Sequence, residues 1–297
     1  MNFHVVQKDR YVDDLRPEDI QLLEDGKPQK LAVFEGPRTG RRTPVEILLL
    51  FDASLSVMNI GLLDPFAIKE TLLDGIGGHV SVAVYAFANR WKRFVKPTRE
   101  ISQLKSALTG VFDFTHAGTR LYESIISTAR DAAESGGNAS RLMVVFSDGF
   151  ATTKMPPKDA ARMAAFYGVS LYPVVLGHQR VLRQAMGGGG GGGPMGRRGI
   201  PDANTVNRQA NARDKEMQIQ EFADLGGLTG GRSFDPPVVN SVMVREIMRA
   251  VAVQVQMQYV AGYYPSSAGQ KRTHHTQVKL VRKDAGRLRG GVRTVLH

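Results

Sequence analysis

From residue 45 onwards, short apolar runs alternate with longer segments whose apolar residues recur at helical spacing. Several of the runs are continuously apolar, as expected for strands covered on both faces. Strand and helix in alternation predict an α/β domain with a mostly parallel central sheet flanked by helices. The predicted strands are 47–52, 80–87, 94–96 (which could be part of an edge hairpin), 142–147, 169–176 and 259–264. The predicted helices are 65–76, 102–109, 121–134, 157–167, 215–225 and 242–257.

The two ends of the chain have a different pattern. The first forty residues indicate short strands and turns, including an Asp-Gly turn at 25–26, and residues 37–44 are polar and turn-rich like a linker. Two further short strands are predicted after Pro265, with His274 and His275 as exposed loop residues. Because an isolated hairpin is marginal in water, we expect both ends to pair in one small β-rich domain. The predicted units are an N-terminal β segment at 1–42, the α/β domain at 43–264 and a C-terminal β segment at 265–297.

Composition narrows the classes of protein. A chain of 297 residues with 42% hydrophobic residues can bury a sizeable core. Its longest apolar stretch, 45–51, is far shorter than the roughly 20 residues that cross a bilayer, and residues 1–10 lack the apolar core of a signal peptide. The chain contains no cysteine, which excludes disulfides, thiolate zinc sites and cysteine nucleophiles.

The net charge of +11 favours anionic partners. The basic residues are spread along the chain, without the aromatic-interleaved stripe on which bases stack. We therefore predict a solvated basic surface and no specific nucleic-acid site.

Seven consecutive glycines occupy residues 187–193. They have no side chain to bury and a large ordering entropy, which predicts a flexible Gly/Arg-rich insertion over 179–213. No Gly-Lys-Ser/Thr follows, so the run is not a phosphate-binding loop. The neighbouring arginines could capture an acidic partner, and the alternative is a tolerated surface loop.

Oxygen-bearing side chains gather where predicted strands end. In open α/β sheets, ligands bind at the carboxyl ends of the strands. Taken singly, each hydroxyl could cap a helix, and the second aspartate could be a turn residue. Together, their carboxylate and hydroxyl oxygens predict a site for a hard cation, Mg²⁺ or Mn²⁺. The residues are Asp52, Ser54, Ser56, Thr119 and Asp148.

The spacing Asp-x-Ser-x-Ser at 52–56, followed by Thr119 and Asp148, resembles the metal-ion-dependent adhesion site (MIDAS) of the von Willebrand factor type A (VWA) family. Segments 15–34, 227–234 and 259–265 are similar to flanking segments of the bacterial VWA-related group. The resemblance implies a Rossmann-like VWA fold in which the three hydroxyls ligate the metal directly and the two carboxylates act mostly through waters. It also implies a secreted or periplasmic protein, although this chain shows no signal peptide.

The function implied by the resemblance is metal-dependent protein interaction or adhesion, without catalysis. Largely neutral direct ligands leave charge on the metal, so an Asp or Glu carboxylate of a protein partner can complete its coordination. One alternative is a phosphohydrolase of the haloacid dehalogenase type with Asp52 as nucleophile, but that chemistry needs an acid where Ser54 stands. The other alternative is a structural VWA module whose metal site is unused.

Overall fold

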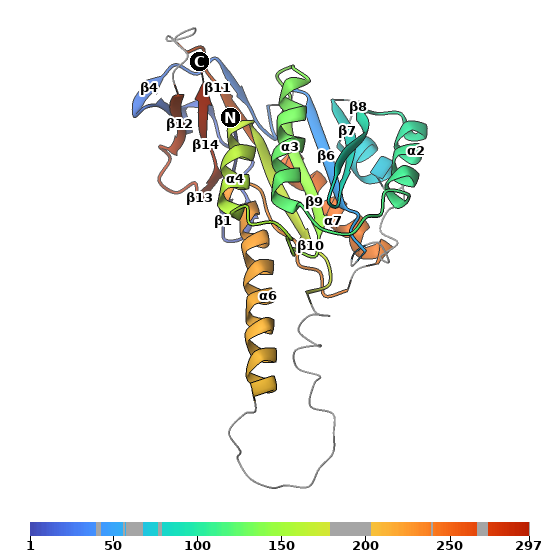
Figure 1. Cartoon of the computed structure of the whole chain (residues 1–297). Helices are drawn as coiled ribbons and strands as arrows, with labels where there is room; N and C mark the ends of the chain where they lie inside the picture. The colour runs from blue at the N-terminus through green and yellow to red at the C-terminus, as the bar shows by residue number, and fades with distance from the viewer. Residues whose placement is uncertain are drawn as a thin grey trace.

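The computed structural model of the chain describes residues 1–39, 43–55, 57, 68–76, 79–178, 203–238, 240–265 and 273–296. Within them, a central sheet with helices on both faces is joined to a smaller unit of β-strands (Figure 1). The predicted fold class, an α/β domain with a mostly parallel central sheet flanked by helices, is confirmed.

The central sheet has the strand order β10-β9-β6-β7-β8. Neighbouring strands are parallel except β7 and β8, which form an antiparallel pair at one edge, so the edge hairpin considered for 94–96 is present. Exposed Lys92 and Lys96 suit β8 to an edge position, because charged side chains discourage further strand pairing. The strands are β6 Val45–Asp52, β7 Val80–Phe87, β8 Trp91–Thr98, β9 Ser140–Ser147 and β10 Val169–Val175.

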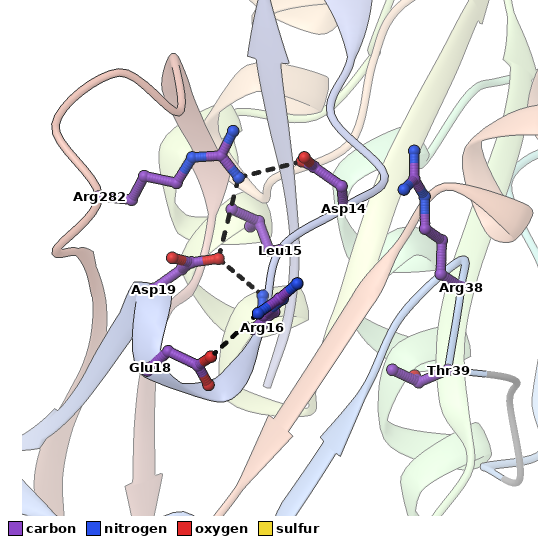
Figure 2. Close-up of a pocket in the computed structure, with 8 residues that line it drawn as sticks. All are labelled: Asp14, Leu15, Arg16, Glu18, Asp19, Arg38, Thr39 and Arg282. Carbon is purple, nitrogen blue, oxygen red and sulfur yellow. Dashed lines mark hydrogen bonds and ion pairs between the residues drawn. The ribbon is translucent and has the colours of Figure 1, made fainter.

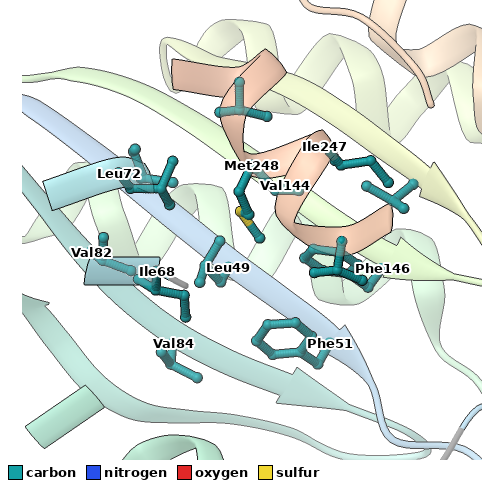
Figure 3. Close-up of a cluster of buried hydrophobic side chains, with 14 of the residues drawn as sticks. Leu49, Phe51, Ile68, Leu72, Val82, Val84, Val144, Phe146, Ile247 and Met248 are labelled. Carbon is teal, nitrogen blue, oxygen red and sulfur yellow. The ribbon is translucent and has the colours of Figure 1, made fainter. Parts of the chain in front are cut away.

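Alternate residues of β6 pack into opposite layers. Leu49 lies in a cluster with Ile247 and Met248 of the covering helix α7 (Figure 3), whereas Leu48 packs in a second cluster with Ile125 of α3. Apolar positions at helical spacing thus close both faces of the sheet. The helices are the π-helix η2 Lys69–Asp74, α2 Ile101–Phe112, α3 Leu121–Glu134, α4 Pro157–Phe166, α6 Ala203–Leu228 and α7 Ser241–Gln256.

Helix α6 is longer than predicted. Of the predicted insertion at 179–213, residues 179–202, with the glycine run, lie outside the described residues, and 203–213 form the first turns of α6, so the prediction of a loop there is wrong. Figure 1 shows these turns projecting beyond the sheet and its covering helices. The early turns are mostly polar in sequence and show no apolar period, whereas Ile219, Phe222 and Leu225 anchor the later turns in the core. No helix in the described ranges is both long and apolar enough to span a membrane.

Strands from both ends of the chain form the smaller unit. One sheet has the path β13-β1-β11-β5, with β2 paired to β1, and the other has the order β14-β12-β3-β4. Phe3, Leu22 and Val278 are buried in its core. Its elements are β1 Asn2–Gln7, β2 Arg10–Tyr11, η1 Pro17–Asp19, β3 Ile20–Glu24, β4 Lys27–Gln29, β5 Val33–Glu35, β11 Tyr259–Gly262, β12 Thr273–Leu280, β13 Arg287–Gly290 and β14 Val292–Leu296.

Strand β11 differs from the prediction that placed it in the α/β domain. It pairs antiparallel with β1 and β5 instead of with the central sheet. The free edge of β10 is met by Phe234, whose backbone exchanges 2.8 Å hydrogen bonds with Pro173 and Val175. The buried ring of Tyr259 stacks on Phe3 at 5.4 Å between ring centroids, which favours pairing with the N-terminal strand. The exact unit boundaries stay a prediction.

The prediction for His274 is also wrong. The residue lies on β12 and is only 7% exposed, with Nδ1 2.8 Å from Oδ2 of Asp25 and 3.8 Å from Oε1 of Glu24. The hydroxyl of Tyr263 donates a 2.7 Å hydrogen bond to the same Glu24 oxygen. Pairing of β12 with β3 brings these groups together, so they connect the two ends of the chain. His275 is exposed, but it belongs to the strand.

A second polar cluster also joins the chain ends. Figure 2 shows Arg282 between Asp14 and Asp19, with nitrogen–oxygen distances of 3.1 and 3.9 Å. The hydrogen bond from Arg282 holds the pKa of Asp14 below its usual range. Both aspartates are thus already paired with Arg282, which gives the cluster a structural role.

Candidate metal site

Asp52 ends strand β6 and is only 3% exposed. The pairing of Phe51 with Phe146 sets Asp52 beside Ser147, whose hydroxyl donates a 2.7 Å hydrogen bond to Oδ2. The backbone N–H of Ser54 donates to Oδ1 at 2.9 Å. Burial raises the pKa of Asp52 to about 6, the two serines oppose that rise, and the charge of Asp148 adds to it.

Ser54 is buried in the loop after β6 and lies beside the segment that leads to Thr119. It forms an isolated parallel bridge with His116, whose N–H points to the carbonyl of Ala53 at 3.4 Å. This contact brings Asp52 and Ser54 to the loop that carries Thr119. Ser56 lies outside the described residues.

Thr119 is buried between α2 and α3, and its backbone is fixed by Thr152. Its N–H donates to the Thr152 hydroxyl at 3.0 Å, and its carbonyl accepts from the Thr152 N–H at 2.9 Å. Helix α3 has Arg120 as its N-cap residue, with no side-chain hydrogen bond at the cap. The Thr119 hydroxyl therefore does not cap helix α3, and its oxygen could ligate a cation.

Asp148 follows β9 in a tight turn. One carboxylate oxygen, Oδ1, accepts a 3.1 Å hydrogen bond from the N–H of Phe150, as expected for the turn role of an aspartate. The next residue, Gly149, has φ of +84°, and a Cβ there would lie 3.4 Å from both the Ile219 backbone and the Phe222 side chain of α6. The turn and α6 together hold Asp148 at the strand end, where its charge acts on Asp52.

The structure adds Ser147, a residue that sequence reasoning left without a role. Its side chain is fully buried, accepts from the N–H of Gly149 at 3.1 Å, and donates to Asp52. A polar residue ending an otherwise apolar strand, next to Asp148, was the available signal. Only the sheet register shows that its hydroxyl donates to the carboxylate of Asp52.

The donor set fits a small hard cation. Among the described residues, no group of three or more His, Cys, Asp or Glu side chains lies close enough to hold a metal. A cation held by Asp52 and Asp148 would therefore need hydroxyl oxygens and waters to complete its coordination, and Mg²⁺ accepts such a set. Burial raises the pKa of the Asp52 carboxyl group, and the charge of Asp148 adds to the rise. A bound cation would offset both the cost of burying the charge and the repulsion between the two carboxylates.

Comparisons with known proteins give likeness at the level of the fold alone. No protein-family profile and no curated protein matches the chain. Among solved structures, it is similar to the conserved hypothetical protein BatB from Bacteroides thetaiotaomicron, at 18% identity and a TM-score of 0.46, over 71% of this chain and 97% of that one. It is also similar to the VWA domain of SpRpn10, at 13% identity and 0.41, over 68% and 94% of the two chains. A third is proximal thread matrix protein 1 from the mussel byssus with a zinc-occupied MIDAS motif, at 14% and 0.43, over 74% and 47%.

Proposed function

We propose that this chain is a metal-dependent protein-interaction module of the VWA type. Mg²⁺ or Mn²⁺ would be held by oxygens of Asp52, Ser54, Ser56, Thr119 and Asp148. The observation that carries the proposal is the buried Asp52 carboxylate beside the charge of Asp148, at the carboxyl ends of β6 and β9. An exported location is part of this proposal and rests on the resemblance to the bacterial VWA-related group.

The chain's own residues would prepare the site for a carboxylate ligand. Ser147 and the Ser54 N–H hold the Asp52 carboxylate in one orientation, and Thr152 fixes the backbone at Thr119. When bound, the cation supplies an electrophilic centre with exchangeable water positions. An Asp or Glu of a protein partner is the ligand that this arrangement suits.

The phosphohydrolase alternative is less well supported. A nucleophilic carboxylate must reach a phosphoryl group, yet Asp52 is buried and both of its oxygens accept hydrogen bonds. The position two residues on is Ser54, whose hydroxyl is too weak an acid to serve as the general acid for a leaving alkoxide at neutral pH. Binding without bond cleavage therefore agrees better with the geometry.

Calorimetric titration of Mg²⁺ and Mn²⁺ into the purified chain tests the proposal. One-site binding should be abolished by Asp52→Asn and Asp148→Ala. The matched control is Asp159→Asn on the surface of α4, where the carboxylate pairs with Arg162, and this substitution should leave divalent binding unchanged. Absence of divalent binding by the wild-type chain, even with excess acetate as a carboxylate donor, would contradict the proposal and favour a structural module.

A further inference from the structure

One residue in the loop after β9 hydrogen-bonds both backbone groups of a predicted ligand. The N–H of Thr119 donates to Oγ1 of Thr152 at 3.0 Å. The carbonyl of Thr119 accepts from the Thr152 N–H at 2.9 Å and from the Thr152 hydroxyl at 3.1 Å. These three hydrogen bonds join segments that lie 33 positions apart in the chain. The side chain of Thr152 takes part in two of them.

The backbone on both sides of the Thr119 Cα is held in this way. The N–H of the next residue, Arg120, donates a 2.8 Å hydrogen bond to the carbonyl of Ala88, so the following peptide group is also tied to a neighbouring loop. A β-branched threonine has few accessible χ1 rotamers. Once its backbone is fixed, the buried Thr119 hydroxyl therefore has little freedom left.

The same loop carries a second predicted ligand. Asp148 stands four residues before Thr152, and its Oδ1 accepts a 3.1 Å hydrogen bond from the N–H of Phe150 between them. Four residues of chain span at most roughly 13–14 Å. Anchoring Thr152 on Thr119 therefore limits how far the turn that carries Asp148 can move from the Thr119 loop.

A neighbouring threonine makes a different contact between the same two segments. The hydroxyl of Thr153 donates a 2.9 Å hydrogen bond to Oε2 of Glu123, in the first turn of α3. This bond ends on a side chain and does not involve the backbone of Thr119. The two adjacent threonines therefore separate a general link between the loops from a link made to a predicted ligand.

We propose that Thr152 is a positioning residue of the metal site. It holds the Thr119 hydroxyl and the Asp148 carboxylate in a fixed relation before a cation binds. The inference rests on the proposed function, because these two groups act together only when a cation lies between them. A site assembled in advance binds with a smaller cost of ordering its loops. Thr152 serves this role through the Thr119 backbone and needs no contact with the cation.

Calorimetric titration of Mg²⁺ into three variants tests the inference. Thr152→Val removes the hydroxyl at an exposed position and keeps the backbone N–H, so the chain should still fold. We expect its Mg²⁺ affinity to fall about 3- to 10-fold, the usual effect of losing one hydrogen bond. Thr152→Ser keeps the hydroxyl and should restore the affinity. The matched control, Thr153→Val, should leave the affinity unchanged.

Hydrogen exchange of the metal-free chain gives a second readout. The Thr119 N–H should exchange faster in Thr152→Val, where it has lost its acceptor, and at the wild-type rate in Thr152→Ser and Thr153→Val. Unchanged exchange of this N–H in Thr152→Val would overturn the inference.

The metal titration separates this inference from the proposed function. If Thr152→Val binds Mg²⁺ as tightly as the wild-type chain, or if Thr153→Val weakens binding equally, the positioning role is overturned and the metal site stands. The same follows if Thr152→Ser fails to restore the affinity. If the wild-type chain binds no divalent cation, the proposed function fails and the positioning role fails with it.

Discussion

The hydroxyl of Ser147 donates a 2.7 Å hydrogen bond to Oδ2 of Asp52, joining the ends of two parallel strands through their side chains. Both residues are buried, so this bond holds the carboxylate in one orientation before any cation arrives. A carboxylate that is preoriented binds a cation with less loss of side-chain freedom.

Ser147→Ala should therefore weaken Mg²⁺ binding and lower the free energy of unfolding by about 1–3 kcal/mol, the usual cost of leaving a buried polar group without its partner. Calorimetry and urea unfolding measure the two effects. Ser140→Ala is the matched control, because Ser140 begins the same strand and hydrogen-bonds Asn2 and Gln258 far from the site. It should reduce stability without changing metal affinity, and an equal loss of affinity in both variants would contradict the role of Ser147.

The pKa of Asp52 predicts how the site responds to pH. Because burial raises it from 3.8 to about 6, metal affinity should fall about tenfold per pH unit below pH 6, as one proton competes with the cation. In the metal-free chain, kept so by a chelator, pH acts on folding stability in the opposite direction. The folded state binds this proton more tightly than the unfolded state, so its contribution to stability is present below pH 4 and is lost as pH rises through 6.

This loss should amount to about 2–2.5 kcal/mol between pH 4 and 7, since one pKa unit corresponds to about 1.4 kcal/mol and the carboxyl group is already partly ionised in the unfolded chain at pH 4. Urea unfolding of the metal-free chain at several pH values, compared with Asp52→Asn, isolates the contribution. The wild-type chain should lose more stability than the variant over this range. Identical pH profiles would show that the carboxylate does not have the raised pKa.

Gly149→Ala should destabilise the chain and weaken metal binding. A Cβ at φ of +84° is strained by about 1–2 kcal/mol. Here the Cβ would also touch Ile219 and Phe222 of α6 at 3.4 Å, so relief of the strain is expected to shift the turn that carries Asp148. Gly136→Ala is the control, with φ of +79° and nothing within 4 Å of the added Cβ. Thermal unfolding and calorimetry of both variants distinguish backbone strain, which they share, from displacement of the site, which only Gly149→Ala should cause.

His274→Ala should lower the free energy of unfolding by about 1–3 kcal/mol, because it removes a buried partner of Glu24 and Asp25. Metal affinity should not change, since these groups belong to the smaller β unit. His275→Ala, at the exposed neighbouring position of the same strand, is the control and should alter stability by less than about 0.5 kcal/mol. Equal effects of both substitutions would argue against the buried cluster.

The order of strands and helices in the central unit followed from the apolar pattern. Helix α3 begins and ends at the predicted residues, and β7 matches its predicted range, because local periodicity is strong there. Four predicted ligands fall at the expected strand ends and loops. Their position in the fold follows from a general rule of parallel sheets, so residue order was sufficient to place them there, and their role as metal ligands stays a prediction.

Other features depended on contacts between distant segments. The partner of β11, the burial of His274 and the length of α6 beyond its apolar anchors were not encoded in local pattern. The same holds for Ser147, whose neighbour across the sheet is set by register. The sequence by itself determined which residue types end each strand, whereas the tertiary structure decided which of them share a buried space, because strand pairing and desolvation are properties of residues far apart in the chain.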